Sequence, residues 1–155
     1  MITDIDEILK ITRNAKRNKQ KIVFTNGCFD IIHSGHCKYL NEAKKIGDIL
    51  IVGLNSDASI KRIKGETRPI NDENNRAFVL TSLRSVDYVV LFDEDTPYNL
   101  INTIVPNVLV KGSDYDVKDI VGADIVIQNG GEVITIPLVV GLSTTNIISK
   151  IQNKY

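Results

Sequence analysis

Five short apolar segments alternate with amphipathic, helix-like segments along this chain, and this alternation constrains its fold most strongly. The segment Ile49–Leu54 is continuously apolar, as expected of a strand that helices cover on both faces. The other expected strands are Lys21–Thr25, Tyr88–Phe92, Val108–Val110 and Glu132–Ile136. Strands that alternate with helices favour parallel pairing. We therefore predict an α/β fold, namely a Rossmann-like, doubly wound, five-stranded parallel sheet.

Capping residues and apolar spacing predict the helices between these strands. Thr3 is expected to cap a first helix, and a second helix is expected from about Ser34 to the stop at Gly47. A short helix should run to Ile60, followed by a polar loop from Lys61 to Pro69.

The later helices follow from the same signals. Asn71 or Asp72 should open a helix with three inward side chains, Phe78, Val79 and Leu83. The remaining expectations are a helix capped at Thr96-Pro97 that reaches Ile104, a short helix near Val117–Val121 with a further turn to Ile127, and a last helix capped by Ser143 with a buried stripe of Ile147, Ile148 and Ile151.

Length and composition indicate an ordinary globular protein. The 155 residues suit a single domain, with residues 1–20 as an N-terminal helix and residues 21–155 as the main core. The chain is 43% hydrophobic and 25% charged, and its formal net charge is zero, which argues against non-specific binding to nucleic acid or acidic membranes. No apolar run approaches a membrane span, and the N-terminus does not resemble a secretory signal. With two cysteines, we expect a reduced, cytoplasmic location.

The segment between the first strand and the second helix carries the chemistry. It reads Gly27-Cys28-Phe29-Asp30, followed shortly by His33-Ser34-Gly35-His36. Residues three apart share a helix face, so both imidazoles can point to one spot above a helix N-terminus. Free backbone N–H groups and the dipole attract anions there. This arrangement suits the phosphates of a nucleotide.

Each residue type in this segment has a chemical reason. Histidines can donate hydrogen bonds to phosphate oxygens on which charge develops during attack at an α-phosphorus. Gly27 and Gly35 keep Cβ atoms away from a backbone that must approach the phosphates. Asp30 is expected to orient neighbouring N–H groups or to help place a metal ion.

A zinc site is the competing interpretation of the same segment, because Cys28, His33, His36 and Cys37 lie within ten residues. Structural zinc sites usually take paired ligands from separate turns, whereas three of these four crowd one helix start. The spacing therefore argues against zinc.

Several motifs in order resemble the heptose 1-phosphate adenylyltransferases, a group within the cytidylyltransferase-like nucleotidyltransferases. The signatures H-x-G-H and G-x-F-D are present, and the patterns G-x-G-x-x-G and G-x-x-x-x-G-K-[ST] are absent. The other matching segments are Gly47–Asp57, Lys64–Pro69, Glu94–Pro97, Val108–Tyr115, Ile120–Gly122, Gly130–Val133 and Ser143–Thr145.

The resemblance implies a set of site residues. The catalytic candidates are His33, His36, Arg76 and Lys64. Among the basic residues in and after the polar loop, which is expected to be mobile and to close over the triphosphate, Arg76 is ranked first, Lys64 next and Arg68 last. The candidate nucleotide-binding residues are Asn26, Gly27, Cys28, Phe29, Asp30, Gly35, Asp57, Lys111, Ser143, Thr144 and Thr145. Ser143 could alternatively be a helix cap alone. Metal ligands are not assigned.

The implied reaction transfers AMP from ATP to a sugar 1-phosphate, D-glycero-β-D-manno-heptose 1-phosphate, with release of pyrophosphate and with Mg²⁺ as cofactor. The resemblance also implies a stand-alone enzyme, and we expect a homodimer. One alternative is a cytidylyltransferase for a small alcohol phosphate such as glycerol 3-phosphate. Leu138 stands where those enzymes usually place an arginine, whereas Arg84 matches their pattern. The other alternative is a nucleotide-binding module without catalysis.

Overall fold

The computed structural model describes residues 1–113 and 117–154. These residues form one six-stranded sheet in which every paired strand is parallel. The strands, in sheet order, are β1 (Ile2–Thr3), β4 (Tyr88–Phe92), β3 (Ile49–Asn55), β2 (Ile22–Gly27), β5 (Val108–Gly112) and β6 (Glu132–Ile136). The predicted doubly wound parallel sheet is confirmed, but the strand count is six rather than five.

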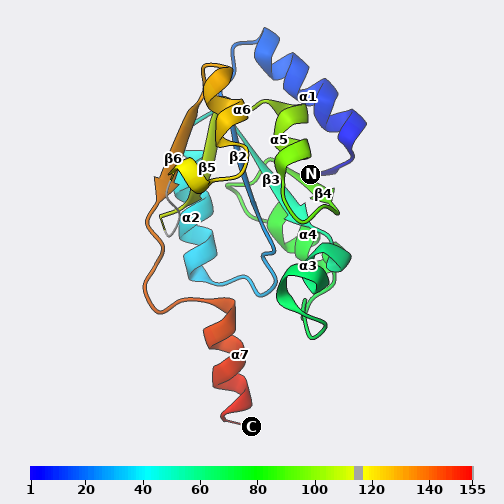
Figure 1. Cartoon of the computed structure of the whole chain (residues 1–155), viewed down its shortest axis with the longest axis vertical. Coiled ribbons are helices and arrows are strands. Elements are labelled where there is room, and N and C mark those ends of the chain that lie inside the picture. Colours follow the sequence, from blue (N-terminus) through cyan, green and yellow to red (C-terminus); the bar gives the residue numbers. More distant parts are fainter. Residues whose placement is uncertain (114–116, 155) are drawn as a thin grey trace.

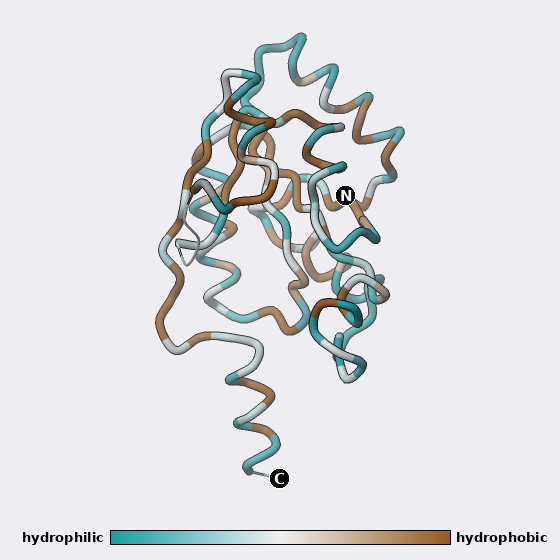
Figure 2. Tube along the Cα trace, in the orientation of Figure 1, coloured by the Kyte–Doolittle hydropathy of each residue, from teal (hydrophilic) through white to brown (hydrophobic). Residues whose placement is uncertain are grey.

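Helices cover both faces of the sheet (Figure 1). The helices are α1 (Ile5–Arg17), α2 (Ser34–Lys44), α3 (Asp57–Lys64), α4 (Glu73–Thr81), α5 (Tyr98–Ile104), a 3₁₀ turn η1 (Val117–Asp119), α6 (Ala123–Gln128) and α7 (Thr144–Gln152). Side chains of α1, α5 and α6 form one core with the sheet, and side chains of α2 and α4 form the other. Figure 2 shows apolar residues gathered on the central strands between these layers.

The missed strand lies at the N-terminus. Ile2 and Thr3 pair with Val89 and Val90 of β4, so Thr3 belongs to a strand and Asp4 caps α1 instead. The Asp4 side chain accepts a hydrogen bond from the Glu7 N–H at 2.8 Å. Two residues are too few to show a strand period, and only pairing across the sheet defines β1.

The inward face of α4 differs from the prediction. Asp72 caps this helix as one of the two expected residues, but Phe78 is 69% exposed and Val79 is 42% exposed. The buried residues are Arg76, Ala77 and Leu80. The prediction, which was based on hydrophobicity, chose the wrong face of α4. An arginine occupies a core position on this helix, where an ion pair compensates its charge.

Two other segments also differ from the prediction. Residues 61–64 continue α3 rather than forming the start of a loop, so the connection to α4 covers only residues 65–72. The helix α7 buries none of its side chains and extends away from the sheet in Figure 1, and Ile151 is 53% exposed. The predicted buried stripe on this helix is therefore wrong.

Residues 114–116, part of a loop expected after the fourth strand, lie outside the described residues.

The order of the strands predicts where this sheet binds a ligand. From β2 the chain continues through β3 to β4 on one side, and then crosses to β5 and β6 on the other. In such sheets the ligand binds beyond the carboxyl ends of the strands at this reversal. Among the described residues, no helix is both long and apolar enough to cross a membrane.

Candidate active site

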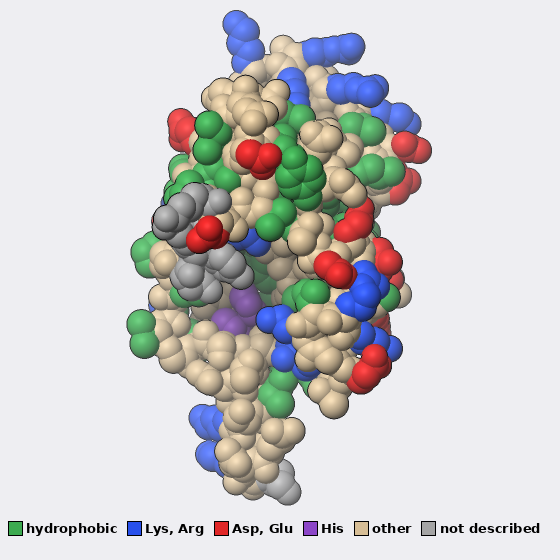
Figure 3. Space-filling model, in the orientation of Figure 1, with side chains coloured by type: hydrophobic (Ala, Val, Ile, Leu, Met, Phe, Trp, Pro, Cys, Tyr) green, Lys and Arg blue, Asp and Glu red, His purple; other side chains and the backbone are tan. Residues whose placement is uncertain are grey.

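A cavity of about 530 Å³ opens at the carboxyl ends of β2, β3 and β5. All but two of the predicted site residues line it, namely Asn26, Gly27, Cys28, Phe29, Asp30, His33, Gly35, His36, Lys64, Lys111, Ser143, Thr144 and Thr145. Figure 3 shows the histidines in a hollow of the surface with basic side chains beside them. The two exceptions are Asp57 and Arg76.

The two histidines are stacked at the start of α2. Their ring centroids lie 3.8 Å apart at an interplanar angle of 21°. The His36 ring also makes an edge-on contact with Phe29, with the two ring centroids 5.3 Å apart. His33 is the N-cap residue, but its side chain makes no capping hydrogen bond. A Cβ atom on Gly35 would lie 3.0 Å from the His33 ring, so a larger residue at this position would require the ring to shift by a few tenths of an ångström.

Three of the four imidazole nitrogens are buried without a hydrogen-bond partner: Nδ1 and Nε2 of His33 and Nδ1 of His36. A fourth buried atom without a partner, Oδ1 of Asn26, lies at the end of β2 in the same cavity. Buried polar atoms are almost always paired in folded proteins, so this group of unpaired atoms indicates a place for a polar ligand.

Both histidines are neutral near pH 7. Burial, and to a lesser extent the neighbouring His33, lower the pKa of His36 to about 4, although a hydrogen bond with the Ile31 backbone opposes the shift. Burial also lowers the pKa of His33. The positive charge that an anionic ligand needs therefore comes from the basic residues of the cavity.

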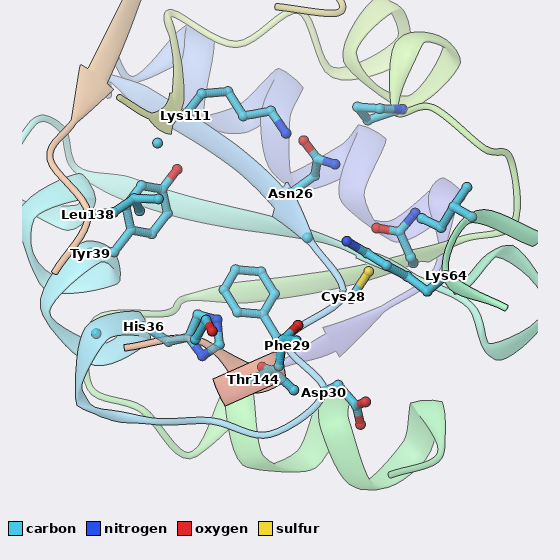
Figure 4. A pocket seen from close by; sticks show the side chains of 18 of the residues that line it. Asn26, Cys28, Phe29, Asp30, His36, Tyr39, Lys64, Lys111, Leu138 and Thr144 are labelled. Atoms are coloured by element: carbon cyan, nitrogen blue, oxygen red, sulfur yellow. The ribbon is translucent and has the colours of Figure 1, made fainter. Parts of the chain in front are cut away.

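Three basic residues line the cavity: Lys64, Arg68 and Lys111. Figure 4 shows Lys111 extending from the end of β5 toward Asn26, and Lys64 near Cys28. Burial raises the pKa of the Cys28 thiol, although Lys64 and two arginines oppose this. The thiol is therefore protonated at neutral pH and is a poor nucleophile.

Asp30 joins the segment after β2 to the loop before α4. Its carboxylate accepts hydrogen bonds from Arg68 Nε at 2.8 Å, from Ile70 N at 2.9 Å and from Asn71 N at 2.8 Å. Burial would raise the pKa of Asp30, but these N–H groups and the Arg68 charge outweigh it and lower the pKa. The expectation that Asp30 orients neighbouring N–H groups agrees with this geometry.

Buried Arg76 pairs with the partly exposed Asp57, and neither residue lines the cavity. Arg76 is 1% exposed and donates to Asp57 Oδ1 at 2.7 Å, to the Cys28 carbonyl at 2.7 Å and to the Asn71 carbonyl at 2.9 Å. All three guanidinium nitrogens are used in these contacts. Arg76 therefore joins the strand-end segment to α3 and α4, whereas it was expected to contact the triphosphate.

The start of α7 forms the opposite wall. Ser143 caps the helix and accepts from Asn146 N at 3.0 Å, and Thr144 Oγ1 donates to the Ile31 carbonyl at 3.5 Å. The cap function of Ser143 leaves the first backbone N–H groups of α7 next to the cavity, where an anion is favoured.

Several lining residues were not among the predicted site residues: Tyr39, Asn55, Ile63, Arg68, Asp95, Thr96, Pro97, Asp119, Ile120, Val121, Leu138, Val139 and Leu142. Position directly after a strand could have indicated Asn55, Asp95 and Thr96. Arg84, weighed as a phosphate contact, instead lines a shallow groove with Lys38 and Lys44.

Neither zinc nor an all-protein magnesium site is built among the described residues. They contain no group of three or more His, Cys, Asp or Glu side chains placed to hold a metal ion. Cys28 and Cys37 are free thiols. Three carboxylates line the described part of the cavity: Asp30 is held by N–H groups, Asp95 is paired with Arg62 at 2.7 Å, and Asp119 is the third. A metal ion that arrives with phosphate ligands fits this donor set better than one caged by protein.

Comparisons with known proteins agree with this geometry. The cytidylyltransferase-like family matches residues 24–150. The bifunctional protein HldE of Campylobacter concisus is 57% identical over 152 residues, which cover 98% of this chain and 30% of that protein. The bifunctional protein HldE of Geobacter metallireducens is 54% identical over 154 residues, which cover 99% and 31%. The chain thus spans about a third of the length of these curated relatives.

Solved structures extend the comparison. The lipopolysaccharide core biosynthesis protein from Thermoplasma volcanium has a TM-score of 0.63 and 31% identity, over 77% of this chain and 97% of that chain. Pantoate-beta-alanine ligase from Francisella tularensis has a TM-score of 0.64 at 19% identity, over 100% and 80%, which is a likeness of fold alone. The family match includes both walls of the cavity, and the chain therefore belongs to the cytidylyltransferase-like family, a family of nucleotidyltransferases.

Proposed function

We propose that this protein transfers AMP from ATP to D-glycero-β-D-manno-heptose 1-phosphate and forms ADP-heptose and pyrophosphate. The similarity to HldE proteins over nearly the whole chain supports this substrate pair, as does the similarity to a lipopolysaccharide core biosynthesis protein. By the same reasoning, the product would supply heptose to a lipopolysaccharide core or another surface glycan.

One observation carries the proposal. Buried, unpaired nitrogens of His33 and His36 face a cavity that the starts of two helices, α2 and α7, also border. Imidazole N–H groups and the N-terminal backbone N–H groups of helices are donors suited to phosphate oxygens. A triphosphate would therefore accept a hydrogen bond from one nitrogen of neutral His33, and from Nδ1 of His36 when this ring carries its second proton.

Positioning and charge stabilisation account for the chemistry. A phosphate oxygen of the acceptor is already anionic near neutral pH, so attack at the α-phosphorus needs no strong general base. The histidines donate to oxygens on which charge develops, and Lys64 and Lys111 neutralise phosphate charge. Asp57 and Arg76 position the strand-end segment through the Cys28 carbonyl rather than contacting substrate.

Mg²⁺ is proposed to enter with ATP as part of the substrate. When bound, it would reduce the negative charge of the phosphates. The protein contributes the cavity and its N–H donors, because Asp30 and Asp95 are already engaged with other protein groups.

The proposal is tested with purified protein and a panel of ATP and CTP against sugar 1-phosphates and glycerol 3-phosphate, with pyrophosphate release as the readout. We expect ATP with the heptose 1-phosphate to give the highest kcat/KM. Higher kcat/KM with CTP would favour a cytidylyltransferase instead. A folded protein that binds ATP but turns over none of these pairs would favour a binding module.

The homodimer is also proposed. Exposed apolar side chains are grouped in the segment that leads into α7, where Leu138 is 50% exposed, Val140 is 97% exposed and Leu142 is 40% exposed, and Ile151 lies on the helix itself. Exposed apolar patches often mark protein interfaces. Sedimentation should show a dimer that Ile151→Glu weakens, and a monomer at micromolar concentration would contradict this.

A further inference from the structure

Arg68 is the arginine that the cavity presents to a ligand. It lines the cavity with a side chain that is 16% exposed, whereas Arg76 is buried and uses its guanidinium within the protein. The structure thus reverses the ranking that sequence alone suggested for these two residues. A guanidinium is the side chain best matched to phosphate, because its donors form a planar fork.

Asp30 fixes the orientation of this guanidinium. The Asp30 side chain is 1% exposed, and its own position is held by the N–H groups of Ile70 and Asn71. It receives Nε of Arg68 at 2.8 Å. Among the described residues, Asp30 is the only ion-pair partner of Arg68, and it contacts Nε, so this pair does not use the two terminal nitrogens of a side chain that lines the cavity. A donor held in place this way loses little conformational entropy when a ligand binds.

The segment that holds Arg68 through Asp30 also contacts the start of α7. Thr144 donates to the carbonyl of Ile31, the residue that follows Asp30, and Figure 4 shows Asp30 and Thr144 in the same part of the cavity. The first N–H groups of α7 and the Arg68 side chain therefore both border this cavity, on either side of the segment that contains Asp30 and Ile31. Helix N-termini and arginines both favour a multiply charged phosphate group.

The charges of the site also support a phosphate position near Arg68. In the free protein the pKa values of both histidines are lowered, so each neutral ring has one N–H and no full positive charge. When the acceptor oxygen bonds to the α-phosphorus, the bond from that phosphorus to the β-phosphate oxygen breaks, and its electron pair remains on pyrophosphate. The leaving group thus gains negative charge that a fixed cation stabilises.

We propose that Arg68, oriented by Asp30, binds the pyrophosphate portion of ATP and stabilises it as it leaves. Arg68 is a binding residue in this scheme, and Asp30 is its positioning residue. The inference rests on the proposed nucleotidyl transfer, but it concerns a part of the site that both ATP and CTP would occupy.

Arg68→Gln tests the inference, because the glutamine amide nitrogen occupies the place of the arginine Nε and can still donate to Asp30. Calorimetry with magnesium pyrophosphate should show affinity reduced about tenfold to a hundredfold, the range for one charge-assisted contact. The KM for ATP should rise similarly, and the KM for the sugar phosphate should change less than twofold. Arg84→Gln, which removes the same charge from an exposed residue outside the cavity, should leave all three values unchanged.

A double-mutant cycle tests Asp30. Asp30→Asn should weaken pyrophosphate binding in the wild-type background and have little further effect in the Arg68→Gln background. Equal effects in both backgrounds would overturn the positioning role. Unchanged pyrophosphate affinity in folded Arg68→Gln, or a rise confined to the KM of the sugar phosphate, would overturn the whole inference. Since pyrophosphate binding needs no sugar, Arg68-dependent binding without turnover would refute the heptose substrate and leave the inference standing.

Discussion

Lowering the pH from 7.5 to 5 should destabilise this protein through its stacked histidines. The pKa of His36 is lowered from 6.5 to about 4, first by burial and then by His33. The unfolded chain therefore takes up a proton at higher pH than the folded protein does. The stability that depends on a neutral His36 is complete above pH 6.5 and is lost as the pH falls toward 4.

The magnitude follows from the size of the shift. At 1.36 kcal/mol per pKa unit, the full shift would correspond to roughly 3 kcal/mol once the pH is below both values. At pH 5 only part of this is lost, and because the ring is not fully buried, solvent screening reduces it further. We expect about 1 kcal/mol of the free energy of unfolding to be lost between pH 7.5 and 5 through His36.

Urea unfolding at several pH values measures this loss. His36→Asn should remove most of the pH dependence in this range, and His33→Asn should remove less. The chain has only two histidines, so the double variant shows what carboxylates contribute. If wild-type protein and the double variant lose the same free energy of unfolding between pH 7.5 and 5, the neutral buried pair is refuted.

Four further outcomes are expected. Arg76→Ala should lower the free energy of unfolding by about 3 kcal/mol, because Asp57 and two carbonyls lose a buried donor, and an unchanged urea midpoint would contradict this. Gly35→Ala should displace the His33 ring and lower kcat about tenfold or more at unchanged melting temperature, whereas normal kcat would show that the ring position does not matter. Folded His36→Asn should lower kcat a hundredfold or so, and near-normal turnover would remove His36 from the mechanism. EDTA should abolish pyrophosphate release without changing the melting temperature of the free protein, and a lowered melting temperature would instead indicate a structural metal.

Local patterns were sufficient for the architecture and for most of the cavity. The apolar run of β3 and the alternation of strands and helices require a covered parallel sheet, because a strand buried on both faces has no polar side to expose. The segment from Gly27 to His36 and the Ser143 cap follow strand ends, and such ends meet at one edge of a parallel sheet. Their positions in the sequence therefore predict that these residues lie close together.

Other features depend on partners far along the chain. The strand β1 exists because Ile2 pairs with Val89, and no local pattern of two residues could indicate it. The exposure of Ile151 depends on the path of α7 away from the sheet, since its apolar spacing alone fits a buried helix equally well.

The roles of the arginines also needed the tertiary structure. A loop arginine and a helix arginine look alike in sequence, and only the fold shows which carboxylate each one meets. Arg76 meets Asp57 in the interior, and Arg68 meets Asp30 at the cavity. Sequence determines which charges are available, whereas long-range packing decides which of them are neutralised inside the protein and which remain for a ligand.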